Sequence, residues 1–325
     1  MKKSTKTILA ATGVAAVSAA VLVTLHQLTA RGFMDMALNR EAPKMLTRNR
    51  SKFMGKGDYS EFFTTLMDGA EKLRAKNTET VEITSHDGLR LVGHWLPKEN
   101  AKRIVIAMHG WRSTWDRDFG VVSDFFEEND CSVLYVQQRS QGESDGEYIG
   151  FGLLERYDCY EWIKWVDSQN TDNLPIYLSG VSMGATTVIM TSGFDLPKNV
   201  KGITADCGFT SPHAIWKHVA ENSFKVPFGI YSSIASDIFK KKLNVDSKEY
   251  SCLSALEKNT RPILFIHGTD DQFVPIDMTF ENYKACKAKK HLFVVPGANH
   301  GMSFFVDPEG YKEQLKNFWA LYDNS

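Results

Sequence analysis

A serine between two glycines stands where a strand-like run turns into a helix-like run. The residues are Gly180-x-Ser182-x-Gly184, and they join LPIYLSG to MGATTVIMTSG. A serine on such a sharp turn projects its hydroxyl from the carboxyl edge of a sheet, and the flanking glycines let the helix and a neighbouring strand approach. The pattern predicts a nucleophilic serine; an incidental turn serine is the alternative.

A serine hydroxyl is a weak nucleophile at its ordinary pKa and needs a base that is held by an acid. After a turn of this kind, the acid and the histidine follow the serine in the chain. His300 lies in a glycine-bracketed loop between the last strand-like run and the final helix, which makes it the candidate base. Asp270 and Asp271 both follow the preceding strand-like run, RPILFIHG. We favour Asp271, which falls four residues after His267, and keep Asp270 as the alternative acid or a helix cap.

The oxyanion formed during acyl transfer needs two backbone N–H donors. One comes from the residue after the nucleophile, here Met183, and the other from the loop after an early strand. Trp111 occupies that loop, directly after His109-Gly110. Further aromatic residues fall in loops expected to border the site, where they either bind an apolar group of the substrate or fill the core. These candidates for substrate binding are Trp115, Phe151, Phe209 and Phe304.

The segments that must position these residues alternate between strand-like runs and helix-like windows. The helical windows cover 114–129, 152–168, 183–193, 275–289 and 308–322. This alternation predicts a mostly parallel, doubly wound sheet with helices on both faces. Before it, two alternating runs flank Asp87-Gly88, which predicts a hairpin and an antiparallel N-terminal edge. The aromatic-rich interval of about 212–260 predicts a small helical lid, because long structureless loops are rare in compact domains.

The beginning of the chain has the composition of a membrane-directed segment. Residues 8–25 carry no charge and follow Lys2, Lys3 and Lys6. About 18 helical residues nearly match a hydrocarbon core of roughly 30 Å. We therefore expect residues 1–30 to be a single-pass transmembrane anchor; a cleaved signal peptide and a buried core helix are the alternatives. The lysine cluster favours an N-terminus on the cytoplasmic side of the cell membrane and a catalytic domain on the outer side.

The remaining chain divides into two predicted parts. Residues 31–77 are expected to form a helical stalk or docking segment, because apolar residues recur at the three-to-four spacing of one helix face: Phe62, Phe63, Leu66, Met67, Ala70 and Leu73. Residues 78–325 are expected to form one catalytic domain.

Composition narrows the possible partners. The chain has 38 Lys and Arg against 39 Asp and Glu, a net charge of −1, which argues against a nucleic-acid partner. Its five cysteines form no C-x-x-C pair and have no histidine at zinc-ligand spacing. No metal site or disulfide framework is predicted, and free buried thiols are expected. Unpaired cysteines fit an oxidising compartment poorly, and the side of the membrane therefore stays open.

These motifs together resemble those of the α/β-hydrolase superfamily. They are His109-Gly110-Trp111, Arg139-x-x-Gly142-x-Ser144-x-Gly146, Gly180-x-Ser182-x-Gly184, His267-x-x-x-Asp271 and His300-Gly301. The resemblance spans about residues 78–323 and is strongest to membrane-anchored bacterial serine hydrolases related to the prolyl-oligopeptidase catalytic domain and to small carboxylesterases. Gln137 stands where the family usually has Asp, and Ser140-Gln141 replaces a common Gly-His pair.

The resemblance implies an α/β-hydrolase fold and hydrolysis through an acyl-enzyme, with no metal or organic cofactor. The first hypothesis is a carboxylesterase that cleaves a small-molecule ester or acyl substrate with Ser182, Asp271 and His300. A peptidase or an acyltransferase with the same triad is the main alternative, and a non-catalytic binding protein on this fold is another. The dehalogenases and epoxide hydrolases of this superfamily have Asp as the nucleophile in the strand-to-helix turn, where this chain has Ser182, and they therefore do not match.

Overall fold

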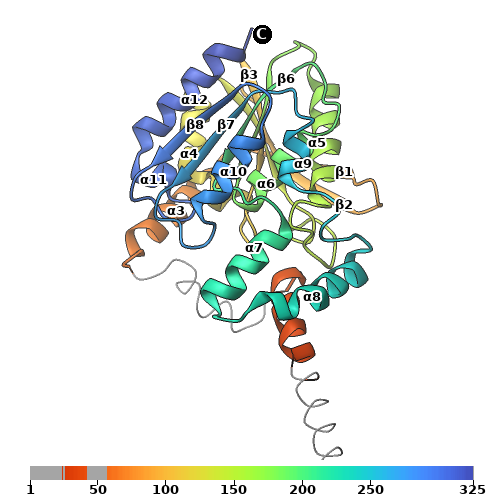
Figure 1. Cartoon of the computed structure of the whole chain (residues 1–325). Helices are drawn as coiled ribbons and strands as arrows, with labels where there is room; N and C mark the ends of the chain where they lie inside the picture. Colours follow the sequence, from red (N-terminus) through yellow and green to blue (C-terminus); the bar gives the residue numbers. More distant parts are fainter. Residues whose placement is uncertain (1–23, 25, 42–56, 325) are drawn as a thin grey trace, which may run out of the picture.

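An eight-stranded sheet with the order β1-β2-β4-β3-β5-β6-β7-β8 forms the centre of the protein (Figure 1). The computed structural model describes residue 24 and residues 26–41 and 57–324. Strand β2 runs antiparallel to both neighbours, and the pairs from β4–β3 to β7–β8 are parallel. The strands are β1 Glu79–Thr84, β2 Arg90–Leu96, β3 Arg103–Met108, β4 Cys131–Gln137, β5 Ile176–Val181, β6 Val200–Asp206, β7 Ile263–Gly268 and β8 Lys290–Val295. The predicted sheet, with its antiparallel edge, is confirmed.

Helices cover both faces of this sheet (Figure 1). Along the central strand β3, Ile104 and Ile106 belong to the core under α5, α6 and α10, whereas Val105 and Ala107 belong to the core under α3, α4 and α12. Alternate side chains of a strand point to opposite faces, so a strand buried on both sides is apolar throughout. The helices are α3 Ser60–Arg74, α4 Trp115–Glu128, α5 Glu155–Gln169, α6 Met183–Thr191, α7 Pro212–His218, the π-helical turn η2 Val219–Ser223, α8 Phe228–Leu243, α9 Cys252–Leu256, α10 Ile276–Ala285, α11 Ser303–Val306 and α12 Pro308–Tyr322.

The interval between β6 and β7 is helical, which confirms the predicted insertion. Its helices α7 and α8 lie beyond the carboxyl ends of the strands, at the lower end of the molecule in Figure 1. A helical segment over residues 26–38 lies beside α8. Lys242 of α8 forms an ion pair with Asp35 at 3.1 Å, and the rings of His26 and Tyr231 are 5.3 Å apart. The insertion and the N-terminal segment therefore meet at the same end of the sheet.

The N-terminal segment is packed on the domain, with Met34 and Leu38 fully buried. No helix in the described ranges is long and apolar enough to cross a bilayer. The predicted anchor over residues 8–25 lies almost entirely outside those ranges, and it stays a prediction. The helix over 26–38 continues across residue 30, where the sequence suggested a division between anchor and stalk.

Helix α3 docks closely on α4. Met67, which the spacing placed on the apolar face of α3, is instead 53% exposed. A Cβ atom at Gly120 of α4 would lie 2.3 Å from the carbonyl carbon of Gly69 of α3, so only glycine permits this approach. The face of α3 with Leu66 and Leu73 is buried in the contact. The predicted helix 275–289 is shorter than expected and ends at Ala285, because Cys286 adopts an extended backbone with ψ of 120° and leads into β8.

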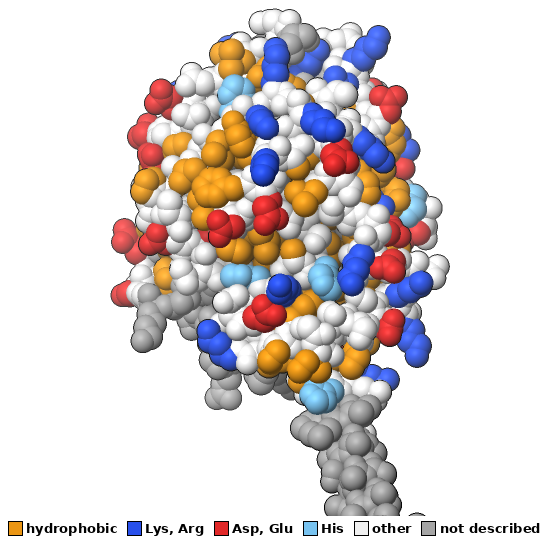
Figure 2. Space-filling view, viewed as in Figure 1, with side chains coloured by type: hydrophobic (Ala, Val, Ile, Leu, Met, Phe, Trp, Pro, Cys, Tyr) orange, Lys and Arg blue, Asp and Glu red, His pale blue; other side chains and the backbone are white. Residues whose placement is uncertain are grey.

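Two compositional expectations can be compared with the structure. All five cysteines are buried and free, which confirms the predicted thiols. Figure 2 shows Lys and Arg side chains interspersed with Asp and Glu over the viewed face, in keeping with the near-zero net charge.

Candidate active site

Ser182 occupies a strained turn between β5 and α6. Its backbone has φ of 56° and ψ of −116°, a conformation that residues with a side chain rarely adopt outside functional sites. A Cβ atom at Gly184 would lie 1.8 Å from the carbonyl oxygen of Met108, and one at Gly180 would lie 2.3 Å from that of Gly184. Both glycines are therefore required for the packing of α6 against β3 and β5. Ser182 N–H donates to the Asp206 carbonyl at 2.8 Å, which ties the turn to the end of β6.

The predicted base and acid lie in line with this serine. His300 Nε2 is 2.9 Å from Ser182 Oγ, and His300 Nδ1 is 2.7 Å from Asp271 Oδ2. The other carboxylate oxygen of Asp271 accepts the N–H groups of Phe273 and Val274 at 2.9 and 2.8 Å. These bonds orient the carboxylate toward the imidazole. The geometry brings together the three residues that the sequence suggested as a triad.

The choice between the two adjacent aspartates is decided by their directions. Asp270 is exposed and accepts a hydrogen bond from the Thr269 hydroxyl at 2.7 Å, whereas the side chain of Asp271 is fully buried against His300. The structure therefore places Asp271, and not Asp270, beside the candidate base.

His267 is a supporting residue whose role was not predicted, although its motif was noted. Its Nε2 lies 3.1 Å from Asp271 Oδ2 and 2.9 Å from the Val274 carbonyl, while its Nδ1 lies 2.7 Å from Thr279 Oγ1. A proton on Nε2 serves both oxygens, and Nδ1 then accepts from the threonine hydroxyl. The four-residue spacing to Asp271 was the available signal.

Electrostatics favour an ion pair between the acid and the base. Burial alone would raise the pKa of the Asp271 carboxyl, but the charge of His300 and the hydrogen bonds of His267 and His300 hold that pKa well below 3.8. Burial alone would likewise lower the pKa of His300, and the Asp271 charge and hydrogen bond hold it well above 6.5. The carboxylate thus stabilises the imidazolium that forms when His300 takes a proton.

Two N–H groups are available for an oxyanion. Met183 is the first residue of α6, where the N–H groups have no partner within the helix and the helix dipole is positive. Trp111 follows Gly110, which lies against the nucleophile: a Cβ atom at Gly110 would be 3.3 Å from the Cβ of Ser182. Among the described residues, neither the Trp111 nor the Met183 N–H has a protein acceptor. Both donors border the nucleophile, as the sequence suggested.

A pocket of about 530 Å³ lies beside Ser182 and His300. One wall is α3, a segment whose part in the site the sequence did not reveal, with Phe62, Phe63 and Leu66. Phe304, one of the aromatic residues suggested for substrate binding, also lines the pocket. Because the contributing face of α3 is decided by how it docks on α4, no local motif marks these residues.

The other predicted substrate-binding aromatics lie elsewhere. Trp115 is buried in the core and its ring stacks on His94 at 4.1 Å, because it faces inward at the start of α4. Phe151 borders a separate small pocket of about 30 Å³, and Phe209 is buried behind it with ring centroids 6.1 Å apart. Trp115 and Phe209 are therefore core residues in this structure, while Phe151 is close to Trp111 and outside the main pocket.

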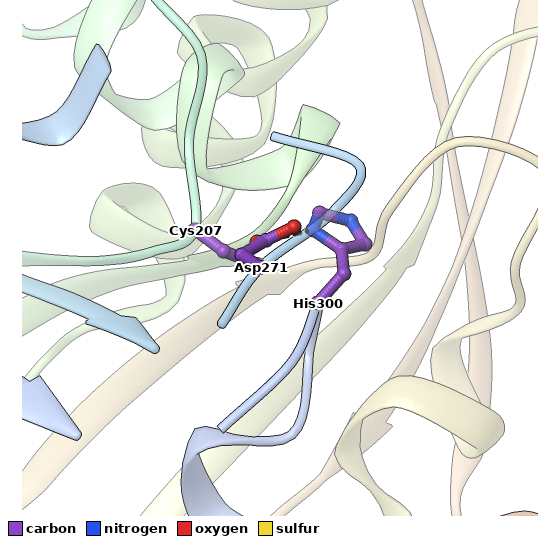
Figure 3. A group of neighbouring side chains, drawn as sticks. All are labelled: Cys207, Asp271 and His300. Carbon is purple, nitrogen blue, oxygen red and sulfur yellow. Dashed lines mark hydrogen bonds and ion pairs between the residues drawn. The ribbon is translucent and has the colours of Figure 1, made fainter. Parts of the chain in front are cut away.

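Cys207, Asp271 and His300 form a compact group at the ends of β6, β7 and β8 (Figure 3). One ligand-type atom from each lies within 4.8 Å of the others, so the set could in principle hold a metal ion. Asp271 and His300 are already hydrogen-bonded to each other, and burial raises the pKa of the Cys207 thiol to about 11. The group is therefore better described as the triad with a neutral thiol packed beside it.

A second candidate metal group is His86, Asp87 and Asp158. The Arg139 guanidinium donates to Asp87 at 2.9 Å and to Asp158 at 2.5 Å. That one cation is paired with both carboxylates, so this group is a structural ion-pair cluster.

The sheet order, the sharp turn at Ser182 between β5 and α6, and the Ser182-His300-Asp271 arrangement define an α/β-hydrolase. Residues 152–323, more than half of the chain, match the prolyl oligopeptidase family. The chain belongs to that family, and its family and fold make it a serine hydrolase.

Individual proteins are similar to this chain in sequence or in fold. The chain is 25% identical to YqkD of Bacillus subtilis over 236 residues, which cover 73% of this chain and 77% of YqkD. Its fold is similar to that of the Pyrococcus furiosus esterase Pf2001, with a TM-score of 0.63, 22% identity, and coverage of 77% of this chain and 92% of the esterase. It is also similar to the Pyrococcus horikoshii acylaminoacyl peptidase, with a TM-score of 0.55, 16% identity, and coverage of 82% and 43%.

Proposed function

We propose that the protein is a serine carboxylesterase that forms an acyl-enzyme on Ser182. The observation that carries the proposal is the unbroken chain of contacts from Ser182 Oγ to His300 to Asp271 beside a pocket with apolar walls. A nucleophile, a base and an oriented acid within hydrogen-bond distance are what nucleophilic acyl transfer needs.

In the proposed reaction, Ser182 Oγ attacks the ester carbonyl carbon while its proton passes to His300 Nε2. The carbonyl oxygen becomes an oxyanion that accepts hydrogen bonds from the Trp111 and Met183 N–H groups. The intermediate then collapses, the bond to the leaving alkoxy oxygen breaks, and His300 delivers its proton to that oxygen. Water, deprotonated by His300, attacks the acyl-enzyme in the same way, releasing the carboxylic acid and restoring Ser182.

The pocket supports a largely uncharged, apolar substrate. Its walls next to Ser182 include Leu66 and Phe304. The charged residues at its exposed rim are balanced, since Asp68 and Asp124 accompany Lys72 and Arg117. A site that anchors a peptide terminus would be expected to present an excess of one sign. An ester with an apolar acyl or aromatic group fits this lining better.

A peptidase is the second candidate, because the chain belongs to the prolyl oligopeptidase family. The same triad would cleave an amide if His300 protonated the leaving nitrogen. Amide and ester substrates with matched acyl groups separate the two candidates.

The test compares nitrophenyl esters of increasing acyl length with aminoacyl nitroanilides, together with labelling by a fluorophosphonate. We expect ester turnover to exceed amide turnover, and we expect Ser182→Ala to abolish both labelling and turnover. The matched control is Ser192→Ala at the other end of α6, whose hydroxyl donates only to the Ile189 carbonyl at 2.7 Å. Preferred amide cleavage would identify a peptidase, and unlabelled wild-type protein would support a non-catalytic binding protein.

Ser182→Ala should also leave the free energy of unfolding within about 1 kcal/mol of wild type, because strained functional turns are not selected for stability. Chemical denaturation of the two proteins measures this, and it ensures that lost labelling reports lost chemistry rather than lost structure.

A further inference from the structure

Two carbonyl groups at the carboxyl end of helix 26–38, those of Met36 and Ala37, accept hydrogen bonds from the turn that contains Trp111. Helices end with carbonyl groups that have no partner within the helix. Trp111 Nε1 donates to the Ala37 carbonyl at 2.9 Å, and the Arg112 guanidinium donates to the carbonyls of Met36 and Arg40, both at 3.0 Å. The same guanidinium also donates to the Asn39 carbonyl. Two consecutive residues of the turn therefore cap this helix.

A cation is well suited to this place. The carboxyl end of a helix carries partial negative charge, and a planar guanidinium can donate to several carbonyls at once. The Arg112 guanidinium also lies over the Trp111 ring, with its Cζ 5.1 Å from the ring centroid. The cap therefore contacts Trp111 directly, through both the ring and the backbone.

The same contacts continue into a third segment. The Arg40 guanidinium donates to the carbonyls of Gly142 and Ser144, both at 2.6 Å. Gln141 Oε1 in turn accepts the Arg112 N–H at 2.6 Å. The turn at 110–113, the segment 36–40 and the loop 141–146 therefore hold one another in a closed ring of hydrogen bonds. Gln141 belongs to the Ser140-Gln141 pair, which stands where the family commonly has Gly-His.

The turn needs such support. Arg112 has φ of 51°, a left-handed conformation that is unfavourable for a residue with a side chain. A backbone held in a rare conformation persists only where its surroundings determine it. The adjacent Trp111 N–H must meet a developing oxyanion, and an error of about 1 Å in such a donor can cost about a hundredfold in rate.

We propose that Arg112 is a positioning residue: by capping helix 26–38 it holds the Trp111 N–H toward the oxyanion, which makes the N-terminal segment part of the catalytic apparatus. The inference rests on the proposed acyl transfer at Ser182. It gives residues 26–41 a function in the reaction that is separate from any role in membrane attachment.

The test uses Arg112→Met in the full-length chain, with kcat and KM measured on a short nitrophenyl ester. Loss of one oxyanion donor typically lowers kcat by about 10²–10³-fold, so a displaced donor should lower it at least about tenfold while KM changes by less than about twofold. The pH at which the rate is half-maximal should stay at the wild-type value, because His300 and Asp271 are not touched. A defect in the base would shift that pH.

The matched control is Arg261→Met. The Arg261 guanidinium also donates to two backbone carbonyls, those of Leu196 at 2.9 Å and Pro197 at 3.1 Å, but it precedes β7 and so lies at the opposite edge of the sheet from Ser182. We expect this variant to lose comparable stability and to keep its kcat within about twofold. Equal loss of kcat in both variants, or no loss in Arg112→Met, would overturn the proposal.

Arg112→Lys provides a second variant if Arg112→Met does not fold. Lysine keeps the positive charge but lacks the planar guanidinium that donates to several carbonyls at once. This variant should therefore have a reduced kcat at unchanged KM. A wild-type kcat would overturn the proposal. The proposed function fails separately, if wild type lacks esterase activity or keeps it in Ser182→Ala. Serine-dependent activity with unaltered Arg112 variants would refute only the positioning role.

Discussion

His300 Nε2 lies 2.9 Å from Ser182 Oγ, although the two residues are 118 positions apart in the chain. They meet because β5 and β8 run parallel and end at the same edge of the sheet, with β6 and β7 between them. The loop after β7 places Asp271 on the far side of the imidazole, 2.7 Å from His300 Nδ1. Three strand ends therefore define the site, and each can be tested by substitution.

The first prediction concerns the acid. Asp271→Asn should lower kcat by about 10⁴-fold, because an amide cannot keep His300 in the tautomer and orientation that accept the serine proton. Asp270→Asn should retain most of the wild-type rate, since Asp270 is exposed and bonded to Thr269. Steady-state kinetics of the two variants on one ester measure the difference, and the reverse ranking would assign the role to Asp270.

The second prediction concerns pH. His300 must be neutral to accept a proton, and its pKa is held well above 6.5, so kcat/KM should rise with pH and be half-maximal above pH 6.5. Asp271→Asn removes the carboxylate charge that raises this pKa and should move the midpoint to lower pH. A pH–rate profile of each protein checks this, and an unshifted midpoint in the variant would contradict it.

The free energy of unfolding should depend on pH in the opposite sense to kcat/KM. The pKa of His300 in the folded protein lies above its value near 6.5 in the unfolded chain. Protonation of His300 therefore stabilises the fold fully below about pH 6.5. This contribution is lost as the pH rises through the folded pKa. Wild type and His300→Ala should thus differ most in free energy of unfolding at low pH. Denaturation at several pH values measures the difference.

The third prediction concerns the pocket. Leu66 lines it from α3, so Leu66→Trp should fill part of its volume of about 530 Å³. Esters with long acyl groups should lose more kcat/KM than the acetate ester, because only the longer groups need that space. Met67→Trp is the control, since Met67 is 53% exposed on the outer side of the same helix. Equal acyl-length profiles for the two variants would place the substrate elsewhere.

The fourth prediction concerns membrane attachment, which we propose for the uncharged run at residues 8–25. Full-length protein should pellet with membranes and resist alkaline carbonate, and Val17→Arg in the centre of the run should weaken this attachment. Leu28 of the helical segment 26–38 and Ile230 of α8 are 59% and 57% exposed. Recovery of the intact full-length protein in the soluble fraction would refute the proposal.

The alternation of strand-like and helix-like runs was sufficient to predict the sheet and the place of Ser182 within it. These signals are local: strand residues repeat every two positions, helix residues every three to four, and a sharp strand-to-helix turn needs glycine beside its serine. The order of the chain then assigned His300, because only one loop lies between the last strand and the last helix.

The remaining features depend on contacts between segments far apart in the chain. Asp270 and Asp271 are adjacent; the spacing from His267 favoured Asp271, but only the folded turn shows that the Asp271 side chain points to His300 and that of Asp270 does not. Whether Trp115 or Phe304 lines the pocket depends on how α4 and α11 are rotated against the sheet. An aromatic residue in the sequence can fill the core or line a cavity, and the residue type does not distinguish the two. Arg112 meets the segment 36–40 across more than 70 positions, a contact that no periodicity or motif records. The sequence by itself determined the strand–helix order and the candidate nucleophile. Tertiary packing decided between the two candidate acids, and it decided the pocket wall and the contacts of the turn at Arg112, because each is a property of two surfaces in contact.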